Sequence, residues 1–386
     1  MRSILVSAAA ALLAPFLASD ACAESMFLTK QYTRCTACHY SPTGGGLLTP
    51  YGQLLSGREL STTGRTAAAP AAGAEDDPRG EQAFLYGTLG DALGPVHLGL
   101  DIRPSSLRID FPGGHQDMNL LMTLDLIGAV QKNGWTAYGA VGREPGHSAV
   151  RDGRTLSGGA FISYEHWVSY QTQKGLRIRG GRFLPAYGVR LADHTAYSRV
   201  SLDLDRNDQV YGLEVSDTIG SSLVQAMISP GKAEAILHDH SHRGFSTAGR
   251  WQYDVTPRAT IVGSAFYRHS TDADPKSGTV GGAFGVAPTS RVSIWTEVDA
   301  DLQTKAAGGH AWVVVNESAV EVYRGLWLKV SPQLRTSDAP GGSDLRRLAL
   351  AADLLPRTHW NVNVVYYRDR AFSATTSTLL TQLHLY

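Results

Sequence analysis

The sequence predicts an all-β protein, a transmembrane antiparallel β-barrel of about sixteen strands, plus or minus two. From residue 82 to Tyr386, segments of roughly nine to thirteen residues alternate apolar with polar or small side chains, the period of a strand with two unlike faces. Short turns alternate with longer polar connections along this stretch, as in barrels that have tight periplasmic turns and longer external loops. Glycine is also abundant, at 41 residues. A soluble β-solenoid or sandwich is the alternative.

The strand count depends on how the barrel begins. Residues 82–103 form one long strand if Gly94-Pro95 is a break within it, and the count is then even, about sixteen. An even number places both ends of the barrel in the periplasm, and the final strand, 376–386, runs inward.

Residues 1–23 have the pattern of an export signal. Arg2 provides the positive start, an apolar core follows, and an Ala-Cys-Ala cleavage pattern ends at Ala23. The third cysteine, Cys22, then leaves with the signal, unless it becomes the acylated first residue of a lipoprotein. No later run of eighteen apolar residues predicts a helical membrane span.

The charge balance excludes one class of partner. The 386 residues contain 35 basic and 35 acidic side chains, so no basic excess points to nucleic acid.

Residues 24–60 contain the motif Cys35-Thr36-Ala37-Cys38-His39. Two cysteines at this spacing can form thioether bonds to one haem, and the adjacent histidine can bind its iron, which predicts one covalent c-type haem. A disulfide between Cys35 and Cys38 is an alternative. Half of a zinc site is another, but the chain has no second cysteine pair to complete it.

The segment 24–60 is too short to bury a haem by itself, because about forty residues do not form an adequate core. It needs walls from the rest of the protein. Three glycines, Gly44 to Gly46, allow its backbone to approach a flat cofactor closely, or form a flexible tether. Residues 61–81 are rich in Ala, Pro and Gly and read as a linker to the barrel, 82–386.

Alternation also predicts which side chains face the lumen. Asn119, Thr123 and Asp125 are expected to face inward. The other face is then lipid-facing and unsuitable for iron ligands: Met118, Leu120, Met122, Leu124 and Leu126. Three histidines are expected to point inward, as polar lining residues: His97, His359 and His384.

Two further groups of histidines are candidate ligands. Residues 184–208 form a long connection rich in aromatic and charged residues, which is expected to fold into the lumen, and His194 within it is the candidate sixth haem ligand. His238, His240 and His242 lie in an external loop, where alternating His and Asp side chains can bind a transition metal such as Fe(II), Cu(II) or Zn(II). A polar loop without a metal is the alternative for both.

The motif at 35–39, followed by Ser-Pro-Thr-Gly-Gly-Gly-Leu-Leu-Thr-Pro-Tyr-Gly at 41–52, a linker and a barrel, resembles the fused monohaem cytochrome–porins of bacterial outer membranes. Residues 181–188 resemble a strand-to-loop element of porins. The resemblance implies haem attachment at Cys35 and Cys38 and iron ligation by His39. It implies no sixth ligand. Some members of that family oxidise iron and carry the electrons inward.

These observations predict an outer-membrane electron-transfer protein with its haem in or at the lumen. Its expected partners are a periplasmic cytochrome or other redox carrier, outer-membrane lipid and an extracellular metal donor such as Fe(II). The sequence does not decide whether the protein is an enzyme. If it is one, we expect a haem-dependent oxidoreductase that oxidises Fe(II). The alternatives are a passive porin with a Cys35–Cys38 disulfide, a haem-based sensor or enzyme with an open sixth site, and a barrel that scaffolds other cytochromes.

Overall fold

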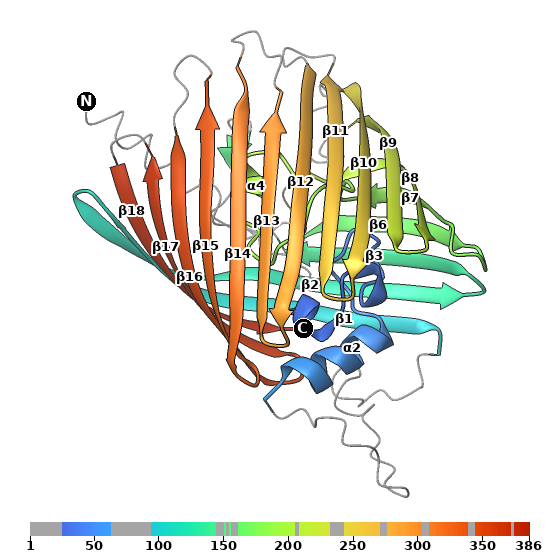
Figure 1. Ribbon diagram of the computed structural model, residues 1–386, viewed down its shortest axis with the longest axis horizontal. Helices are drawn as coiled ribbons and strands as arrows, with labels where there is room; N and C mark the ends of the chain where they lie inside the picture. The colour runs from blue at the N-terminus through green and yellow to red at the C-terminus, as the bar shows by residue number, and fades with distance from the viewer. Residues whose placement is uncertain are drawn as a thin grey trace, which may run out of the picture.

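The computed structural model is a closed antiparallel barrel of sixteen strands, as predicted (Figure 1). The structure describes residues 25–62, 94–143, 150–151, 154–155, 161–204, 208–231, 243–270, 276–302, 309–338, 344–371 and 374–386. The predicted signal at 1–23, nearly all of the predicted linker and the histidines of the external loop, His238, His240 and His242, lie outside these residues.

Consecutive barrel strands pair with each other, and β1 closes the barrel by pairing with β18. The strands are β1 (Val96–Phe111), β2 (Gly114–Lys132), β3 (Trp135–Arg143), β6 (Phe161–Gln171), β7 (Arg177–Phe183), β8 (Val210–Ile219), β9 (Ser222–Gly231), β10 (Arg243–Thr256), β11 (Ala259–Ser270), β12 (Lys276–Thr289), β13 (Val292–Asp301), β14 (Ala311–Tyr323), β15 (Leu326–Ser337), β16 (Leu345–Arg357), β17 (Trp360–Ala371) and β18 (Ala374–Leu385). A separate hairpin, β4 (Val150–Arg151) and β5 (Arg154–Thr155), lies between β3 and β6.

The strands bury one face and expose an apolar one, as β14 illustrates. Val313, Val315 and Glu317 point inward and are buried, whereas Trp312 and Val322 are exposed on the outside. An apolar exterior with aromatic residues near strand ends matches a bilayer. Among the helices of the described part, none is long and apolar enough to cross a membrane.

The first strand differs from the prediction. Gly94 and Pro95 form a turn, and β1 begins after them at Val96 and continues to Phe111, where it turns directly into β2. The expected break at Gly94-Pro95 is present, since proline cannot donate to a strand ladder and Gly94 has a φ of +56°, and of the expected strand 82–103 the described part of β1 contains only 96–103. Residues 82–93 lie outside the described part.

A β-bulge reverses the facing of β2. Arg103 pairs with Thr123 and Pro104 pairs with Leu121, so Met122 is an extra residue. Thr123 and Asp125 face inward as predicted, but Met122 is also buried inside the barrel and accepts a hydrogen bond from Gln382 Nε2 at 3.1 Å.

The bulge also moves the neighbours of Met122. Met118 and Leu120 pack against the same inner cluster, and Asn119 is exposed. The predicted lipid-facing positions of Met118, Leu120 and Met122 and the predicted inward position of Asn119 are therefore wrong. The alternation has a period of exactly two, so one extra residue reverses every position on one side of the bulge.

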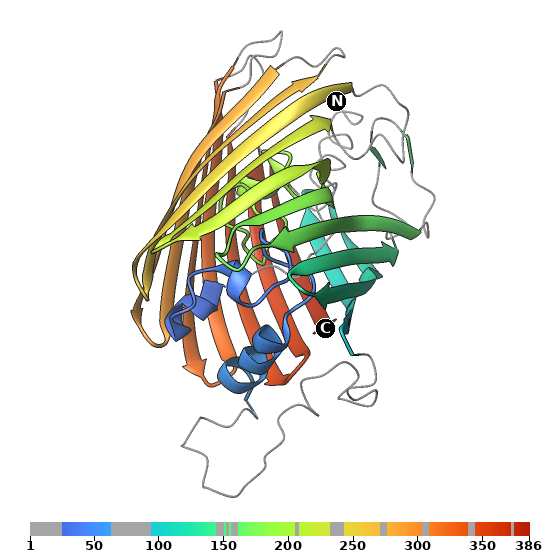
Figure 2. The same ribbon diagram turned by 90° about the vertical axis from the view of Figure 1, so that its right-hand side faces the viewer.

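Residues 25–62 lie inside one end of the barrel and are called the plug here (Figure 2, blue). The plug contains η1 (Ser25–Lys30), η2 (Cys35–Ala37), α2 (Pro50–Leu55) and η3 (Ser56–Leu60). The same end, called the turn end, carries the C-terminus and seven short turns: 132–135, 171–177, 219–222, 256–259, 289–292, 323–326 and 357–360. Short turns mark the periplasmic side of such barrels.

The connection from β7 to β8 crosses the lumen, as predicted. Residues 184–204, called the lumen loop here, include α4 (Tyr197–Val200), which lies inside the barrel (Figure 1). Its buried residues include Leu184, Leu191 and Leu204. Together the plug and the lumen loop form much of the inner core.

Candidate functional site

Ion pairs attach the plug to the barrel wall at the turn end. Lys30 Nζ lies 2.9 Å from Glu321 Oε2 on β14, and Arg34 Nε lies 2.6 Å from Asp254 Oδ2 on β10. The four side chains are mostly shielded from solvent, so each pair contributes more than an exposed surface pair would. Gln252 Nε2 also donates to the Thr33 carbonyl oxygen at 2.7 Å. The segment directly before Cys35 is thereby held against the wall.

The predicted haem motif forms a single helical turn. The backbone N–H groups of Cys38 and His39 donate to the Cys35 carbonyl oxygen at 3.1 and 3.0 Å. Residues at spacings of three and four lie on the same side of such a turn. The spacing of Cys35, Cys38 and His39 is the one that this rule favours for a shared side, and both cysteines are free thiols. This arrangement matches what covalent attachment of one haem requires.

After His39 the chain makes a glycine turn and returns along itself. Tyr40 N–H donates to the Leu47 carbonyl oxygen at 3.2 Å, and Thr49 N–H donates to that of Cys38 at 2.8 Å. Gly44, Gly45 and Gly46 have φ angles of +83°, +73° and +62°, which favour glycine at all three positions. The glycines therefore build a defined turn rather than a flexible tether.

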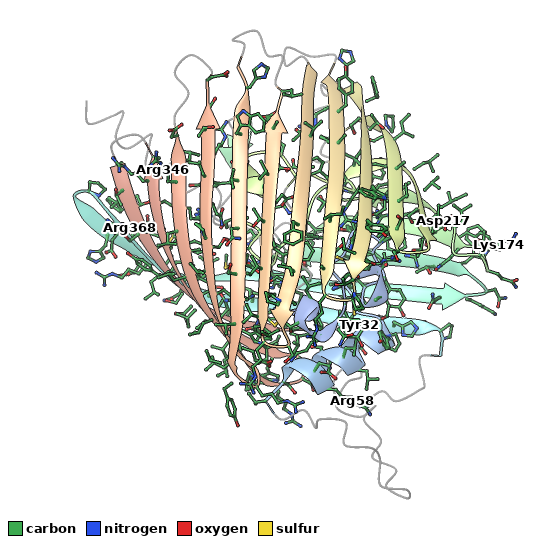
Figure 3. All side chains as sticks on the ribbon, viewed as in Figure 1. Tyr32, Arg58, Lys174, Asp217, Arg346 and Arg368 are labelled. Atoms are coloured by element: carbon green, nitrogen blue, oxygen red, sulfur yellow. The ribbon has the colours of Figure 1, made fainter. Side chains whose placement is uncertain are left out.

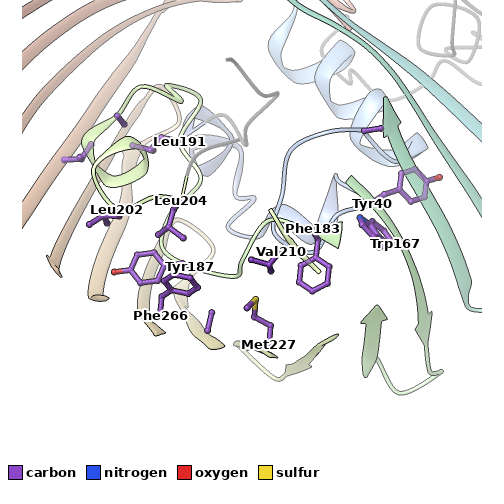
Figure 4. Close-up of a cluster of buried hydrophobic side chains, with 14 of the residues drawn as sticks. Tyr40, Trp167, Phe183, Tyr187, Leu191, Leu202, Leu204, Val210, Met227 and Phe266 are labelled. Atoms are coloured by element: carbon purple, nitrogen blue, oxygen red, sulfur yellow. The ribbon is translucent and has the colours of Figure 1, made fainter. Parts of the chain in front are cut away.

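An aromatic wall of the barrel receives this turn (Figure 4). The rings of Tyr138 and Trp167 are stacked with centroids 4.8 Å apart, and Tyr40, Leu47 and Phe183 belong to the same buried cluster. Leu47 N–H donates to Tyr138 Oη at 3.3 Å. Burial of these large rings is a main source of the free energy that docks the plug.

Arginines from the wall and the lumen loop complete the contacts with the plug. Arg179 of β7 is fully buried, donates to Ser41 Oγ at 3.3 Å and pairs with Glu214 at 2.7 Å. Arg190 of the lumen loop donates to the Gly44 carbonyl oxygen. These bonds join the plug, the wall and the loop into one packed unit.

Beside His39 lies a cavity of about 380 Å³. This volume is within the range of about 300–1,000 Å³ typical of cofactor sites. Much of the lining is apolar and comes from the plug, β1 and β16–β18: Leu47, Leu48, Leu98, Leu100, Ala349, Ala351, Val365 and Leu380. Porin lumens are usually polar, so an apolar chamber here suits a flat apolar group such as a porphyrin.

The chamber places four histidines around one space: His39, His194, His359 and His384. The structure therefore brings together the two haem-ligand candidates of the sequence, His39 of the plug and His194 of the lumen loop. The inward direction predicted for His359 and His384 is confirmed. His97 also points inward, but it packs on the Tyr40 ring at 5.5 Å and does not line this cavity.

The burial of the motif controls its protonation. Burial lowers the pKa of His39 to about 4, and the positive charge of Arg190 lowers it further. Hydrogen bonds to the backbone of Gly46 and Gly45 raise this pKa, but by less. His39 is therefore neutral at pH 7, the form that can bind a metal. Burial, and then the neighbouring Cys35, raises the pKa of Cys38 to about 11.

The two ends of the motif open on different spaces. Cys35 lines a second cavity of only about 20 Å³, together with Tyr187, Arg190 and Arg250. That space holds little more than one water molecule. The side of His39 therefore has room for a flat group such as a haem, but neither cysteine lines that chamber, and the lumen loop closes the side of Cys35.

Arg347 of β16 holds the lumen loop across the barrel. Its guanidinium donates to Asp369 Oδ1 at 2.6 Å and to the Thr195 carbonyl oxygen at 2.8 Å, and it lies 5.2 Å from the ring centre of Tyr197. No sequence motif marks Arg347 or the aromatic pair Tyr138 and Trp167 as functional residues. The alternation in their strands places them inward, but it does not identify their partners.

Sequence comparisons show no relatives: no family model matches the chain, and no curated protein matches it. Solved structures show similar folds. A loop L8 deletion mutant of OmpT, an outer membrane protein of Vibrio cholerae, superposes with a TM-score of 0.55 at 9% identity, covering 75% of this chain and 99% of that one. An anion-selective porin from Comamonas acidovorans has a TM-score of 0.54 at 11% identity, covering 75% and 99%.

The outer membrane channel DcaP of Acinetobacter baumannii is also similar, with a TM-score of 0.53 at 9% identity, covering 75% of this chain and 97% of that one. At these identities the similarity shows the fold alone. The chain is a porin-type barrel, and that fold, with the apolar exterior, places it in the bacterial outer membrane as predicted.

Proposed function

We propose that this porin-type barrel is an outer-membrane electron-transfer protein with one c-type haem, attached through Cys35 and Cys38 and bound by His39. The observation that carries the proposal is the helical turn 35–39, which carries two free thiols and places a neutral His39 beside a lumen chamber of about 380 Å³. A c-type haem in this place would supply one-electron redox chemistry.

The chain's own residues contribute position and dielectric. The ion pairs of Lys30 and Arg34 fix the plug at the turn end, and the glycine turn seats it against Tyr138. The lining of the chamber combines apolar side chains with charged ones, among them Arg103, Lys329 and Asp353, and both kinds influence the potential of a bound redox group. An electron from an extracellular donor such as Fe(II) then reaches a periplasmic carrier through the lumen, as the cytochrome–porin resemblance implies.

His194 is the proposed sixth ligand. It lines the same chamber as His39 and comes from the lumen loop, a separate element that Arg347 fixes across the barrel. His359 and His384 also line this chamber and are the alternatives.

A passive porin is the second candidate, favoured by the fold similarity to an outer membrane channel and an anion-selective porin. In that case Cys35 and Cys38 serve as a disulfide, and solutes pass the plug. A haem-based sensor or enzyme with an open sixth coordination position on the iron is a further alternative. A six-coordinate low-spin spectrum in both redox states would argue against it.

Covalent haem staining on a denaturing gel tests the proposal. The wild-type chain and a Thr36→Ala control, which keeps both cysteines, are expected to stain, and the double variant Cys35→Ala/Cys38→Ala is expected to lose the stain. Unstained wild-type protein from cells with a complete haem-attachment pathway would exclude the electron-transfer function. Conductance in planar bilayers would then decide for the porin.

A redox titration in liposomes tests the iron donor. We expect Fe(II) added outside to reduce the protein, with a potential near that of the Fe(III)/Fe(II) couple under the same conditions. A potential far below that couple would exclude Fe(II) as the donor and leave the haem proposal standing.

A further inference from the structure

The short turns around the plug are basic. Six of the seven carry a lysine or arginine: Lys132, Lys174, Arg258, Arg291, Arg324 and Arg357. The chain as a whole has equal numbers of basic and acidic side chains, so the basic character of these turns is local. The turn 219–222 is the exception among the seven.

The acidic side chains at this end are partly neutralised by the plug. Asp254 pairs with Arg34, and Glu321 pairs with Lys30. Arg324 instead donates to the carbonyl oxygens of Ser61 and Arg58, which carry no net charge, so its positive charge remains at the seam between plug and barrel. Among the described residues, Asp217, Glu59 and the C-terminal carboxylate of Tyr386 are acidic groups at this end that oppose the basic rim.

The haem motif lies within this rim. Arg34, directly before Cys35, donates to the Gly220 carbonyl oxygen in the turn 219–222 at 3.3 Å, and Ala37 is exposed. Tyr32 lies at the same lower end of the molecule as Arg58 (Figure 3). Its hydroxyl lies 2.9 Å from that of Tyr51, a side chain 47% exposed. The centre of the face is therefore aromatic and uncharged.

Two of the basic residues have another explanation. Lys132 ends β2, and Trp135 begins β3 after the turn. Lys174 lies in the turn that follows β6, close to Tyr170 near the end of that strand. The rings of Trp135 and Tyr170 are exposed on the outside with centroids 5.0 Å apart. Such aromatic residues mark the level of lipid headgroups, so these two lysines belong to the membrane interface. Arg324 bonds to the plug, and Arg58, Arg258, Arg291 and Arg357 are the other basic residues of this face.

We propose that the turn end of the plug, with Tyr32 and Tyr51 at its centre and Arg58, Arg258 and Arg291 around it, docks a soluble periplasmic redox protein with an acidic surface around its redox centre. The inference rests on the proposed electron-transfer function. A basic rim increases the rate of encounter with an acidic partner and orients it, while a small uncharged centre permits rapid release. Short residence suits a carrier that must leave after one electron.

Binding to nanodiscs of phosphatidylcholine that contain the full-length holoprotein tests the proposal, with an acidic flavodoxin as the probe and basic mitochondrial cytochrome c as its counterpart. The double variant Arg258→Glu/Arg291→Glu is expected to weaken flavodoxin binding about tenfold or more at low salt, because both charges change sign. The effect disappears at about 0.5 M salt, where screening is strong. Cytochrome c binding is expected to become stronger, and Arg58→Glu acts in the same direction with a smaller effect.

The matched control is Arg346→Glu/Arg368→Glu, two exposed arginines far from the turn end (Figure 3). Equal weakening by the control pair, or no weakening by Arg258→Glu/Arg291→Glu, overturns the docking face. If Arg258→Glu/Arg291→Glu changes flavodoxin binding only in discs that contain anionic phosphatidylglycerol, the arginines bind lipid and the proposal is also wrong. Covalent haem is stained in the same samples. Unstained wild-type protein would contradict the electron-transfer function itself. Stained protein in which Arg258→Glu/Arg291→Glu leaves flavodoxin binding unchanged would contradict the docking face alone.

Discussion

Gly46 lies so close to Tyr138 that a Cβ atom at position 46 would overlap the Tyr138 hydroxyl. The same hydroxyl accepts a hydrogen bond from the Leu47 backbone at 3.3 Å. One tyrosine of the barrel wall thus fixes the turn that follows the haem motif, and it links the conformation of the plug to the register of β3.

Substitution Gly46→Ala is expected to loosen the plug. The left-handed φ of +62° adds strain of about 1–2 kcal/mol for a residue with a side chain, and the methyl group adds the overlap with Tyr138. We expect faster cleavage of the plug by proteinase K in detergent, with the barrel intact. Gly249→Ala is the control, because a Cβ there meets no atom within 4 Å.

Adding Tyr138→Phe to Gly46→Ala is expected to restore part of the protection, since it removes the overlapping oxygen. No restoration would show that backbone strain alone accounts for the loss.

His194→Ala is expected to change the iron spectrum of the holoprotein from low spin to high spin. His194 of the lumen loop lines the same chamber as His39 of the plug and is the proposed sixth ligand. The attachment through Cys35 and Cys38 remains, so covalent staining stays at the wild-type level. Magnetic circular dichroism or electron paramagnetic resonance measures the change. His359→Ala and His384→Ala are matched controls, and a switch to high spin in one of them instead would move the sixth ligand there.

Arg347→Gln is expected to release the lumen loop and raise single-channel conductance. The change removes the bonds to Thr195 and leaves Asp369 without its 2.6 Å partner, at a cost of about 3–5 kcal/mol for a broken buried pair. Arg346→Gln, exposed one residue away, is the control. Equal conductance in both variants would show that other contacts hold the loop.

Reversal of one anchor tests the attachment of the plug. Arg34→Asp places two carboxylates together beside Asp254, and we expect rapid proteolysis of the plug and less haem per barrel. The double variant Arg34→Asp/Asp254→Arg re-forms the pair in the opposite sense and is expected to recover protection. Recovery must exceed that of Asp254→Arg alone; otherwise the ion pair has no role in docking.

Much of the architecture was predictable from the sequence. Alternation of period two, the mostly alternating short and long connections, and even parity were enough for a sixteen-stranded barrel, because each strand shows its apolar face in its own sequence and satisfies its backbone by pairing with its neighbours. The connections 111–114 and 371–374 are exceptions, since they are short at the opposite end. The motif 35–39 is equally local: its spacing alone predicts the helical turn that carries Cys35, Cys38 and His39. The pattern failed where one residue broke the period, at the bulge of Met122 opposite Pro104.

Only the tertiary structure decided what surrounds the motif. Tyr138, Arg347 and His194 come from strands and loops far apart in the chain, and their meeting with the plug depends on closure of the barrel and on the path of the lumen loop. The basic rim has the same origin, since six turns spread over more than two hundred residues become neighbours only when the strands close into a ring. Local spacing determines which groups a turn can present; long-range packing determines which other groups they face.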